Sequence, residues 1–410
     1  MKAQTRTAVR TLRKKNNAHS TVVGGSTASL VLKCNGSIVE AQYAPVEEWK
    51  PWSARGTALH TIMEEALRDD LSSHQIYDGF VGVELEQITI TRDMIAAKVL
   101  PALEFFDATV PPDAAVHLET KVDYPGYKWE NDALPRIEGA FGTGDVFFSC
   151  NETNRHGGID WKFGDGHIVE ANDNDQGKFY LCGAIAGEWL PVVEEYEFWI
   201  FQPSSQLTPD QFAKKAIYTL GELVDFAHNL ADAVTAKPTY ETGEHCKWCK
   251  GKLTCAPYNE LITTAVKTDV GKLSTQDLAK MLDMVSGMRA FCMEVEAAAR
   301  RNAHDGLTIP GWTLMDAKGD RVFKDEQAAL GALSRLGLGR KETVSPNAIT
   351  APQALALLRK IGTPEKEVLR FEKRHIERPD KGKRLVKAAP GADTRGAMER
   401  LGVAMKARGL

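Results

Sequence analysis

The chain lacks long apolar runs: none approaches the ~18 residues that a membrane-spanning helix needs. Its basic first residues lead into no apolar stretch, so we expect no secretory signal, no membrane partner and a cytoplasmic location. Only 7 of 410 residues are cysteine, an odd number that argues against a disulfide framework and favours free or metal-bound thiols. With 43% hydrophobic and 26% charged residues, the composition excludes disorder of the whole chain, and the length predicts two or three domains.

Acidic residues are absent from residues 1–39, which carry a charge of +7. Residues 351–410 are also basic, with 15 Lys and Arg against 7 Asp and Glu. Because the whole chain carries −4, residues 40–350 carry −19. Basic ends can bind a polyanion through counterion release, and an acidic middle suits a metal site built from carboxylates. A solvated surface without function is the alternative explanation for each basic end.

Hydrophobic periodicity along residues 1–265 predicts a mixed α/β protein behind a basic disordered arm at 1–25. The sequence predicts helices at 26–32, 53–68, 172–189 and 212–234, and strands at 116–122, 144–149, 158–163, 167–171 and 196–201. Short turns join consecutive strands, so at least part of the sheet is expected to be antiparallel.

The remaining residues have a different pattern, with helical spacing and repeated Gly and Pro breaks. A long helix is expected over 270–305, opened by Ser274 and Asp277 as a capping box. Its near-heptad apolar spacing fits one helix packed on a domain, or a dimerising coiled coil. Residues 311–323 predict a hairpin that turns at Lys318-Gly319. The expected organisation is therefore a main domain at 26–265, the long helix, and a small basic accessory domain at 306–410.

Two carboxylates and a lysine fall on predicted neighbouring strands. Asp145 follows Gly142-Thr143-Gly144, and Asp160 and Lys162 stand two apart. Residues two apart on a strand point to one face, so Asp145 converges on the other two if the strands are antiparallel neighbours. Paired carboxylates repel unless a cation such as Mg²⁺ or Mn²⁺ binds between them. Such an ion activates water and polarises a phosphoryl oxygen, and Lys162 stabilises negative charge, which together predict phosphodiester hydrolysis.

Other residues could complete this site. His60 is able to bind the metal through a neutral ring nitrogen, and the carbonyl oxygen of Trp161 is a further candidate ligand. Gln176 and Tyr180 share one face of a predicted helix, where they either support the site or belong to the edge of the core. Roles for two nearby acids, Glu64 and Glu119, stay open. An Asp-x-Lys tripeptide by itself is most often a surface ion pair.

The order Gly-x-x-x-His, Gly-x-x-Asp, Ile-Asp-x-Lys-x-Gly, Gln-x-x-x-Tyr resembles the RecB-like branch of the PD-(D/E)XK nucleases over roughly residues 56–180. The resemblance implies an α/β fold with a restriction-endonuclease-like mixed sheet flanked by helices, followed here by a mainly helical C-terminal region. It also implies metal-dependent cleavage of DNA. The residues to which it gives catalytic or supporting roles are His60, Asp145, Asp160, Lys162, Gln176 and Tyr180, with the metal bound by His60, Asp145, Asp160 and Trp161.

A second group of residues is a set of thiols. Cys246, Cys249 and Cys255 form Cys-x₂-Cys-x₅-Cys, one thiol short of the four that zinc or a [4Fe–4S] cluster needs. His245 is badly placed to reach the same ion as its neighbour Cys246, so Cys34 is the better fourth ligand. The other three cysteines lie in apolar stretches and are predicted to be core residues: Cys150, Cys182 and Cys292.

One cysteine before the nuclease motifs and three after them is similar to the iron–sulfur RecB-like nucleases, including the CRISPR-associated RecB-like exonucleases. The segments beginning at Ser26, Lys33, Gly142 and Gly243 resemble a phage-associated family of that branch. These resemblances imply a [4Fe–4S] cluster that joins the two ends of the nuclease domain, with zinc as the alternative. They also imply DNA as partner, a single-strand annealing or other recombination protein as a further candidate, and a bacterial host cytoplasm.

Three functions fit these patterns. The first is a metal-dependent DNA nuclease, expected to be an exonuclease in phage or mobile-element recombination or replication, with the basic C-terminal region extending its DNA contacts. The second is a non-catalytic DNA-binding or recruitment protein that retains the nuclease fold. The third is a zinc-ribbon interaction protein in which the Asp-x-Lys match is accidental. Exonuclease or endonuclease action, one metal ion or two, and the oligomeric state are left open by the sequence.

Overall fold

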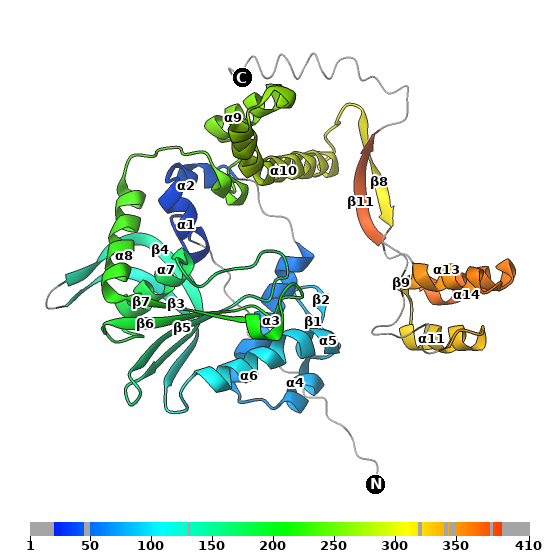
Figure 1. Ribbon diagram of the computed structural model, residues 1–410, viewed down its shortest axis with the longest axis horizontal. Coiled ribbons are helices and arrows are strands. Elements are labelled where there is room, and N and C mark those ends of the chain that lie inside the picture. The colour runs from blue at the N-terminus through cyan, green and yellow to red at the C-terminus, as the bar shows by residue number, and fades with distance from the viewer. Residues whose placement is uncertain are drawn as a thin grey trace, which may run out of the picture. The chain divides into compact units, whose positions relative to one another are not determined.

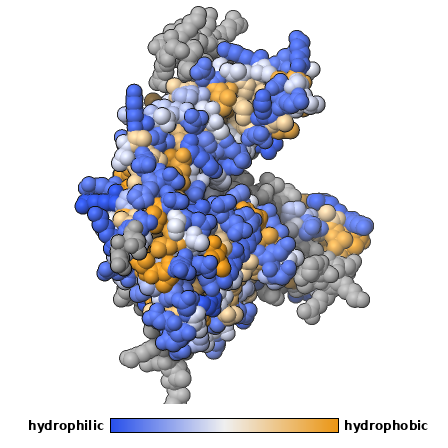
Figure 2. Space-filling view, turned by 60° about the vertical axis from the view of Figure 1, so that its left-hand side comes forward, coloured by the Kyte–Doolittle hydropathy of each residue, from blue (hydrophilic) through white to orange (hydrophobic). Residues whose placement is uncertain are grey.

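The computed structural model describes residues 20–44, 50–129, 132–318, 322–339, 343, 350–377 and 380–387. The chain divides into two compact units, the first ending at Phe291 and the second beginning at Cys292. Most of the expected arm at 1–25 lies outside the described residues. The described helices include none that is both long and apolar enough to cross a bilayer. On the face shown in Figure 2, hydrophilic side chains surround separate apolar patches.

A five-stranded mixed sheet forms the centre of the described part of the first unit (Figure 1). In spatial order its strands are β3 (Ala115–Trp129), β4 (Asp132–Cys150), β5 (Arg155–Trp161), β6 (Glu195–Phe201) and β7 (Ala213–Thr219). All neighbours pair antiparallel except β5 and β6, which are parallel. The parallel pair follows from a crossover through α7 (Asp175–Ala186), since parallel neighbours need a long connection. The predicted mixed α/β architecture is confirmed.

Helices cover both faces of this sheet, and each face has its own apolar core. Phe147 packs on one face and its neighbours Val146 and Phe148 on the other, as strand alternation requires. The Phe147 face is covered by α1 (Gly25–Lys33), α7 and α8 (Leu220–Thr235). The other face is covered by α3 (Pro51–Arg68), α4 (Ser73–Phe80) and α6 (Leu100–Thr109).

Shorter elements complete the first unit. They are α2 (Gly36–Ala41), the hairpin of β1 (Glu84–Leu85) and β2 (Ile88–Thr89), α5 (Arg92–Met94), the π-helical turn η1 (Ile95–Val99), the 3₁₀ turns η2 (Pro209–Gln211), η3 (Glu244–Trp248) and η4 (Val270–Lys272), and α9 (Ala256–Lys267). A buried cluster that includes Tyr258 and Ile262 packs α9 against the middle of the long helix α10 (Thr275–His304), at Met288 and Phe291.

Three sequence predictions in the first unit need correction. Residues 167–171 form no strand, because the backbone of Val169 donates to the Gln202 side chain rather than to a neighbouring strand. The expected helix at 212–234 is a strand up to Thr219, because alternate residues there are buried against β6. The helix expected at 172–189 begins later, at Asp175, because Asn174 caps it, and it ends at Ala186.

Beyond the end of α10, the described part of the second unit contains two two-stranded sheets and three helices. Its elements are β8 (Trp312–Lys318), β9 (Val322–Phe323), α11 (Glu326–Arg335), α13 (Ala351–Lys360), α14 (Glu365–His375), β10 (Ile376–Glu377) and β11 (Asp380–Lys387). The hairpin expected at 311–323 is wrong, because β8 pairs with the distant β11 and β9 pairs with β10. The proposed turn residue Lys318 ends β8, and Gly319 lies outside the described residues. The division between the units falls within α10, whose predicted cap at Ser274 is confirmed by a hydrogen bond from the backbone of Asp277.

Candidate functional site

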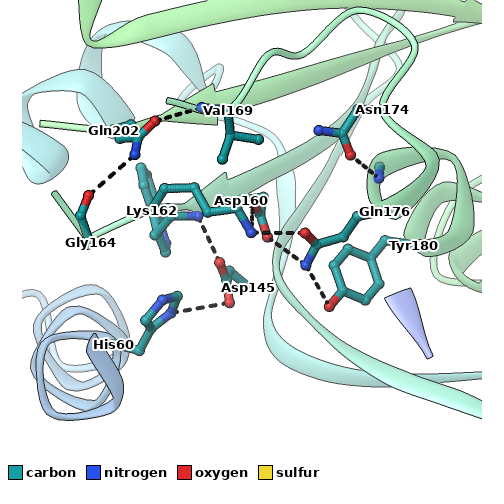
Figure 3. A network of polar contacts seen from close by, with 12 residues as sticks. His60, Asp145, Asp160, Lys162, Gly164, Val169, Asn174, Gln176, Tyr180 and Gln202 are labelled. Atoms are coloured by element: carbon teal, nitrogen blue, oxygen red, sulfur yellow. Dashed lines mark hydrogen bonds and ion pairs between the residues drawn. The ribbon is translucent and has the colours of Figure 1, made fainter. Parts of the chain in front are cut away.

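The register of two strands brings the predicted carboxylates together. Val146 of β4 pairs with Ile159 of β5 in antiparallel fashion, so Asp145 and Asp160 stand opposite each other on one face of the sheet. Lys162 follows Asp160 by two residues, and its Nζ lies 2.7 Å from Asp160 Oδ2. All three line a polar pocket of about 340 Å³ together with Trp161. The predicted convergence of these side chains is thus present in the structure (Figure 3).

His60 reaches the same pocket from α3, on the opposite side from α7 (Figure 3). Its Nδ1 lies 3.2 Å from Asp145 Oδ1 and 3.8 Å from Glu119 Oε1. The second Asp145 oxygen accepts a hydrogen bond of 2.7 Å from the backbone N–H of Trp161. The ligand atoms of His60, Glu119 and Asp145 all lie within 4.8 Å of one another, close enough to bind one metal ion.

Glu119 occupies an unusual backbone position. Its φ of +46° lies in the left-handed region, which residues other than glycine seldom adopt. Glu119 does so although its neighbours Leu118 and Thr120 both pair with residues of β4. Such backbone strain is typical of functional sites, where the surrounding structure fixes it. Glu64, the other uncertain acid, instead pairs with Arg68 at 2.5 Å on the same helix. Between these two acids, the geometry therefore favours Glu119 for the site.

Electrostatic interactions shift the pKa values of the two aspartates in opposite directions. Burial disfavours ionised Asp145, but the charge and hydrogen bond of His60 outweigh this effect and lower the pKa of Asp145. Burial also opposes protonation of His60, but Asp145 and Glu119 raise the pKa of its ring to about 10. At Asp160 the opposite balance holds, because burial raises its pKa despite the attraction of Lys162. In the absence of a cation, the imidazolium of His60 therefore balances the charge of its carboxylate neighbours.

The residues predicted to support catalysis contact the lysine and the second carboxylate. Gln176 accepts a hydrogen bond of 2.9 Å from Lys162 Nζ and donates to the Tyr180 hydroxyl at 3.1 Å. Its amide nitrogen also lies 3.5 Å from Asp160 Oδ1. Gln176 thus fixes the position of the Lys162 ammonium beside the carboxylate, as Figure 3 shows.

The position of Tyr180 depends on glycine. A Cβ atom at Gly25 would lie 2.6 Å from the Tyr180 ring, and one at Gly142 would lie 3.0 Å from it. The first distance is shorter than real Cβ contacts and the second is tight, so the ring lies there because Gly25 lacks a Cβ, and the missing Cβ of Gly142 leaves it further room. This gives a structural reason for the glycine at the beginning of Gly142-Thr143-Gly144-Asp145.

Sequence reasoning missed the residues that hold the segment after Lys162. Gln202 is buried, accepts from the Val169 backbone, and donates to the carbonyls of Gly164 and His167. Asp165 accepts from Lys98 Nζ at 2.5 Å and pairs with Arg55 at 3.4 Å. The only available sequence signal was the position of Asp165 directly after the Asp-x-Lys-x-Gly motif.

The four predicted cysteine ligands, Cys34, Cys246, Cys249 and Cys255, line a second pocket. Its N-terminal wall is fixed by Asn35, which donates to the carbonyl of Ala233 at 3.0 Å and accepts from the Thr239 backbone at 2.7 Å. Segments that precede and follow the strands of the sheet in the sequence therefore meet at this pocket. Within the described part of the chain, these sulfurs make no group of three within 4.8 Å.

Burial dominates the chemistry of these thiols. It raises the pKa of Cys249 to about 11 and also raises the pKa values of Cys246 and Cys255. The thiols of Cys246, Cys249 and Cys255 therefore stay protonated at neutral pH unless a cation displaces the protons. Of the three cysteines predicted to be core residues, Cys150 and Cys182 are buried, but Cys292 is exposed on α10. The prediction for Cys292 is wrong because α10 presents that side to solvent.

Comparisons with known proteins bear on the whole chain. Among solved structures, the chain is similar to one titled "Crystal structure of SSO0001", with 13% sequence identity and a TM-score of 0.25, over 57% of this chain and 97% of that chain. A likeness this weak supports no functional argument. A family model matches residues 19–393, which is most of the sequence. The chain therefore belongs to the family described as "Protein of unknown function (DUF2800)".

Proposed function

We propose that the protein is a metal-dependent deoxyribonuclease. The observation that carries this proposal is the meeting of Asp145, Asp160 and Lys162 with His60 in one open polar pocket. This is the set of groups that phosphodiester hydrolysis needs: acidic ligands for a cation, and a fixed ammonium beside them. The resemblance of the motif order to RecB-like PD-(D/E)XK nucleases supports the same reaction.

The donor atoms present suit a hard divalent cation. Asp160 Oδ2 is buried, and among the described residues its close partner is the Lys162 ammonium at 2.7 Å, which leaves a further lone pair on this oxygen. A lone pair so placed is available to a metal ion. Carboxylate oxygens with one imidazole favour Mg²⁺ or Mn²⁺. The ligands would be His60, Asp145 and Asp160, with Glu119 and the Trp161 carbonyl as further donors.

When bound, the ion would supply Lewis acidity toward the phosphoryl group and toward a water molecule. The protein's own groups account for the rest of the proposed mechanism. Lys162, positioned by Gln176, donates to the attacking water or to a phosphoryl oxygen and stabilises the negative charge that develops there. Tyr180 fixes the amide of Gln176 through its hydroxyl. Asp145 keeps the His60 ring oriented toward the same point.

The test is degradation of DNA by the purified full-length protein in Mg²⁺ or Mn²⁺. Asp160→Asn and Lys162→Ala should abolish degradation, whereas Asp283→Asn and Lys280→Ala, exposed on α10, should leave it unchanged. Retention of wild-type activity by both pocket variants would falsify the assignment. Tight DNA binding without turnover in either metal would instead support the non-catalytic alternative.

We further propose that the reaction is exonucleolytic and serves phage or mobile-element recombination or replication. This rests on the family resemblance, which also favours a single-strand annealing or other recombination protein as partner. Linear DNA labelled at either end should then be shortened from an end, while closed circular DNA stays intact. Cleavage of the closed circle at a comparable rate would contradict exonuclease action.

We also propose that the four cysteines bind a [4Fe–4S] cluster. Four thiols from segments far apart in sequence line one pocket. A single zinc ion, with Zn–S bonds near 2.3 Å, would hold its sulfurs within roughly 4 Å of one another, whereas a four-iron cluster spaces them more widely. Anaerobically purified protein should contain iron and sulfide and absorb near 400 nm. Stoichiometric zinc without colour would instead support the zinc alternative.

A further inference from the structure

Four basic side chains follow one face of α14 in the second unit. Lys366, Arg370, Lys373 and Arg374 are all exposed, and their spacing of i, i+4, i+7 and i+8 puts them on one side of the helix. Val368, on the other side, is buried in the core that α11, α13 and α14 share. The cationic face therefore points to solvent from a packed support.

One exposed acid of the same helix, Glu367, stands at the edge of this face and offsets part of its charge. None of the four basic side chains makes an ion pair with the residues that the structure describes, whereas Arg359 nearby is paired with Glu365 at 2.9 Å. Like charges three or four positions apart repel one another and destabilise a helix. Attraction to the helix C-terminus offsets this for Lys373 and Arg374, but Lys366 lies in the first turn, where a cation is unfavourable.

Positive charge continues from this face onto the neighbouring elements. Lys324, exposed beside β9, donates to the carbonyl of Lys373 at 3.1 Å, and Arg335 is exposed at the end of α11. Burial lowers the pKa of His375, and the charges of Arg374 and Arg335 lower it further. Asp325 is the acid that acts against them there. The cations of α11 and α14 thus act on a common surface.

We propose that the cationic face of α14 binds the phosphate backbone of DNA. At 1.5 Å per residue, Lys366 and Arg374 are about 12 Å apart along the helix, which spans several phosphates of one strand. Lysine and arginine without accompanying amide or aromatic side chains favour phosphate contacts over reading of bases. The inference rests on the proposed function only for the choice of DNA as the polyanion, since the four cations belong to the second unit and the catalytic residues to the first.

The experiment measures the affinity of the full-length protein for a 30-base-pair duplex in EDTA, from 50 to 300 mM KCl. Each phosphate contact contributes about 0.9 to the slope of log affinity against log salt. Replacing Lys366, Arg370, Lys373 and Arg374 together by Gln should reduce that slope by about 3 to 4 and the affinity at least tenfold. The control replaces four exposed cations that are paired with acids, Arg136, Lys272, Lys280 and Arg359, by Gln, and should change the slope by less than about 1.

An unchanged slope in the α14 variant would overturn the proposal, and so would an equal loss in the control, because net charge alone would then explain binding. A single-stranded 30-mer in parallel identifies which form of DNA this face contacts, and loss on either form supports the proposal. Cleavage is assayed separately on the same proteins. If Asp160→Asn shows that the nuclease assignment fails, the salt slopes still test α14, because EDTA excludes cleavage from the binding measurement.

Discussion

The carboxylate pocket and the cysteine pocket differ in how the chain builds them. Asp145, Asp160 and Lys162 stand on paired strands, and hydrogen bonds connect them to His60 and Gln176 without any ion. The thiols stand in loops and turns, and burial keeps three of them, Cys246, Cys249 and Cys255, neutral. A pocket whose groups already satisfy one another should retain its shape when its metal is removed. The loops that carry the cysteines should instead depend on a bound metal ion or cluster for their stability.

The largest expected effect is on activity. Asp160→Asn and Lys162→Ala should each lower the rate of DNA degradation by at least about 10³-fold, because each removes a group that acts on the reacting phosphate. Thermal unfolding should be unchanged or slightly raised in Asp160→Asn, because burial already disfavours the charged form of this carboxyl group. A large drop in Tm would show that the carboxylate pocket also stabilises the fold, and the two pockets would then no longer differ in this respect.

The second largest effect is on stability. Cys249→Ser should lower Tm by about 10 °C and abolish binding of the iron–sulfur cluster or zinc ion, because one ligand is lost from a site that connects segments distant in sequence. Cys292→Ser is the matched control, since this thiol is exposed, and it should change neither quantity. Equal behaviour of the two variants would mean that the cysteine pocket binds nothing that stabilises the protein.

A smaller effect separates the two uncertain acids. Glu119→Gln should weaken Mn²⁺ binding about 10- to 100-fold, because it removes a donor from the group formed with His60 and Asp145. Glu64→Gln should leave binding within about twofold, because that carboxylate pairs with Arg68. Isothermal titration with Mn²⁺ measures both, and stronger weakening by Glu64→Gln would reverse the assignment.

The smallest effect tests the ion pair of Glu197 with Arg155, which lines neither pocket. Burial opposes ionisation of Glu197, but hydrogen bonds from Arg155, Trp199 and Lys215 lower its pKa to about 2. Its contribution to stability is therefore complete above the ordinary pKa near 4.5 and disappears as the pH falls toward 2. Glu197→Gln should cost about 2 kcal/mol at pH 7 and less at pH 3, by denaturant unfolding. Glu195→Gln, exposed on the same strand, should cost little at either pH.

The first pocket could be predicted from sequence because strand geometry is periodic. Residues two apart on a strand share a face, which predicts that Asp160 and Lys162 lie together, and helical spacing predicts the same for Gln176 and Tyr180. Gln202 and Asp165 could not be found this way, because they act through a loop whose course depends on tertiary contacts. The left-handed backbone of Glu119 likewise has no local sequence signal.

The C-terminal region shows the same limit at the level of topology. Helical periodicity identified a mainly helical segment, but the pairing of β8 with β11 joins residues more than sixty positions apart. No turn signal marks such a pairing, so the sequence predicts a local hairpin that includes Trp312–Lys318. The strand at 213–219 was missed for a related reason, since Ala, Lys and Tyr there also fit a helix and only pairing with β6 decides.

The two-stranded sheet of β9 and β10 has an evolutionary consequence. Phe323 and Ile376 are paired across these strands, so the chain leaves this sheet and returns to it at nearly the same point. Everything between them, α14 included, is an insert whose two ends meet. Such an insert can be exchanged for another, or for a tight turn, without changing the strands that carry it. Variation in length and sequence within the family should therefore be tolerated between Phe323 and Ile376 more readily than in the strands themselves.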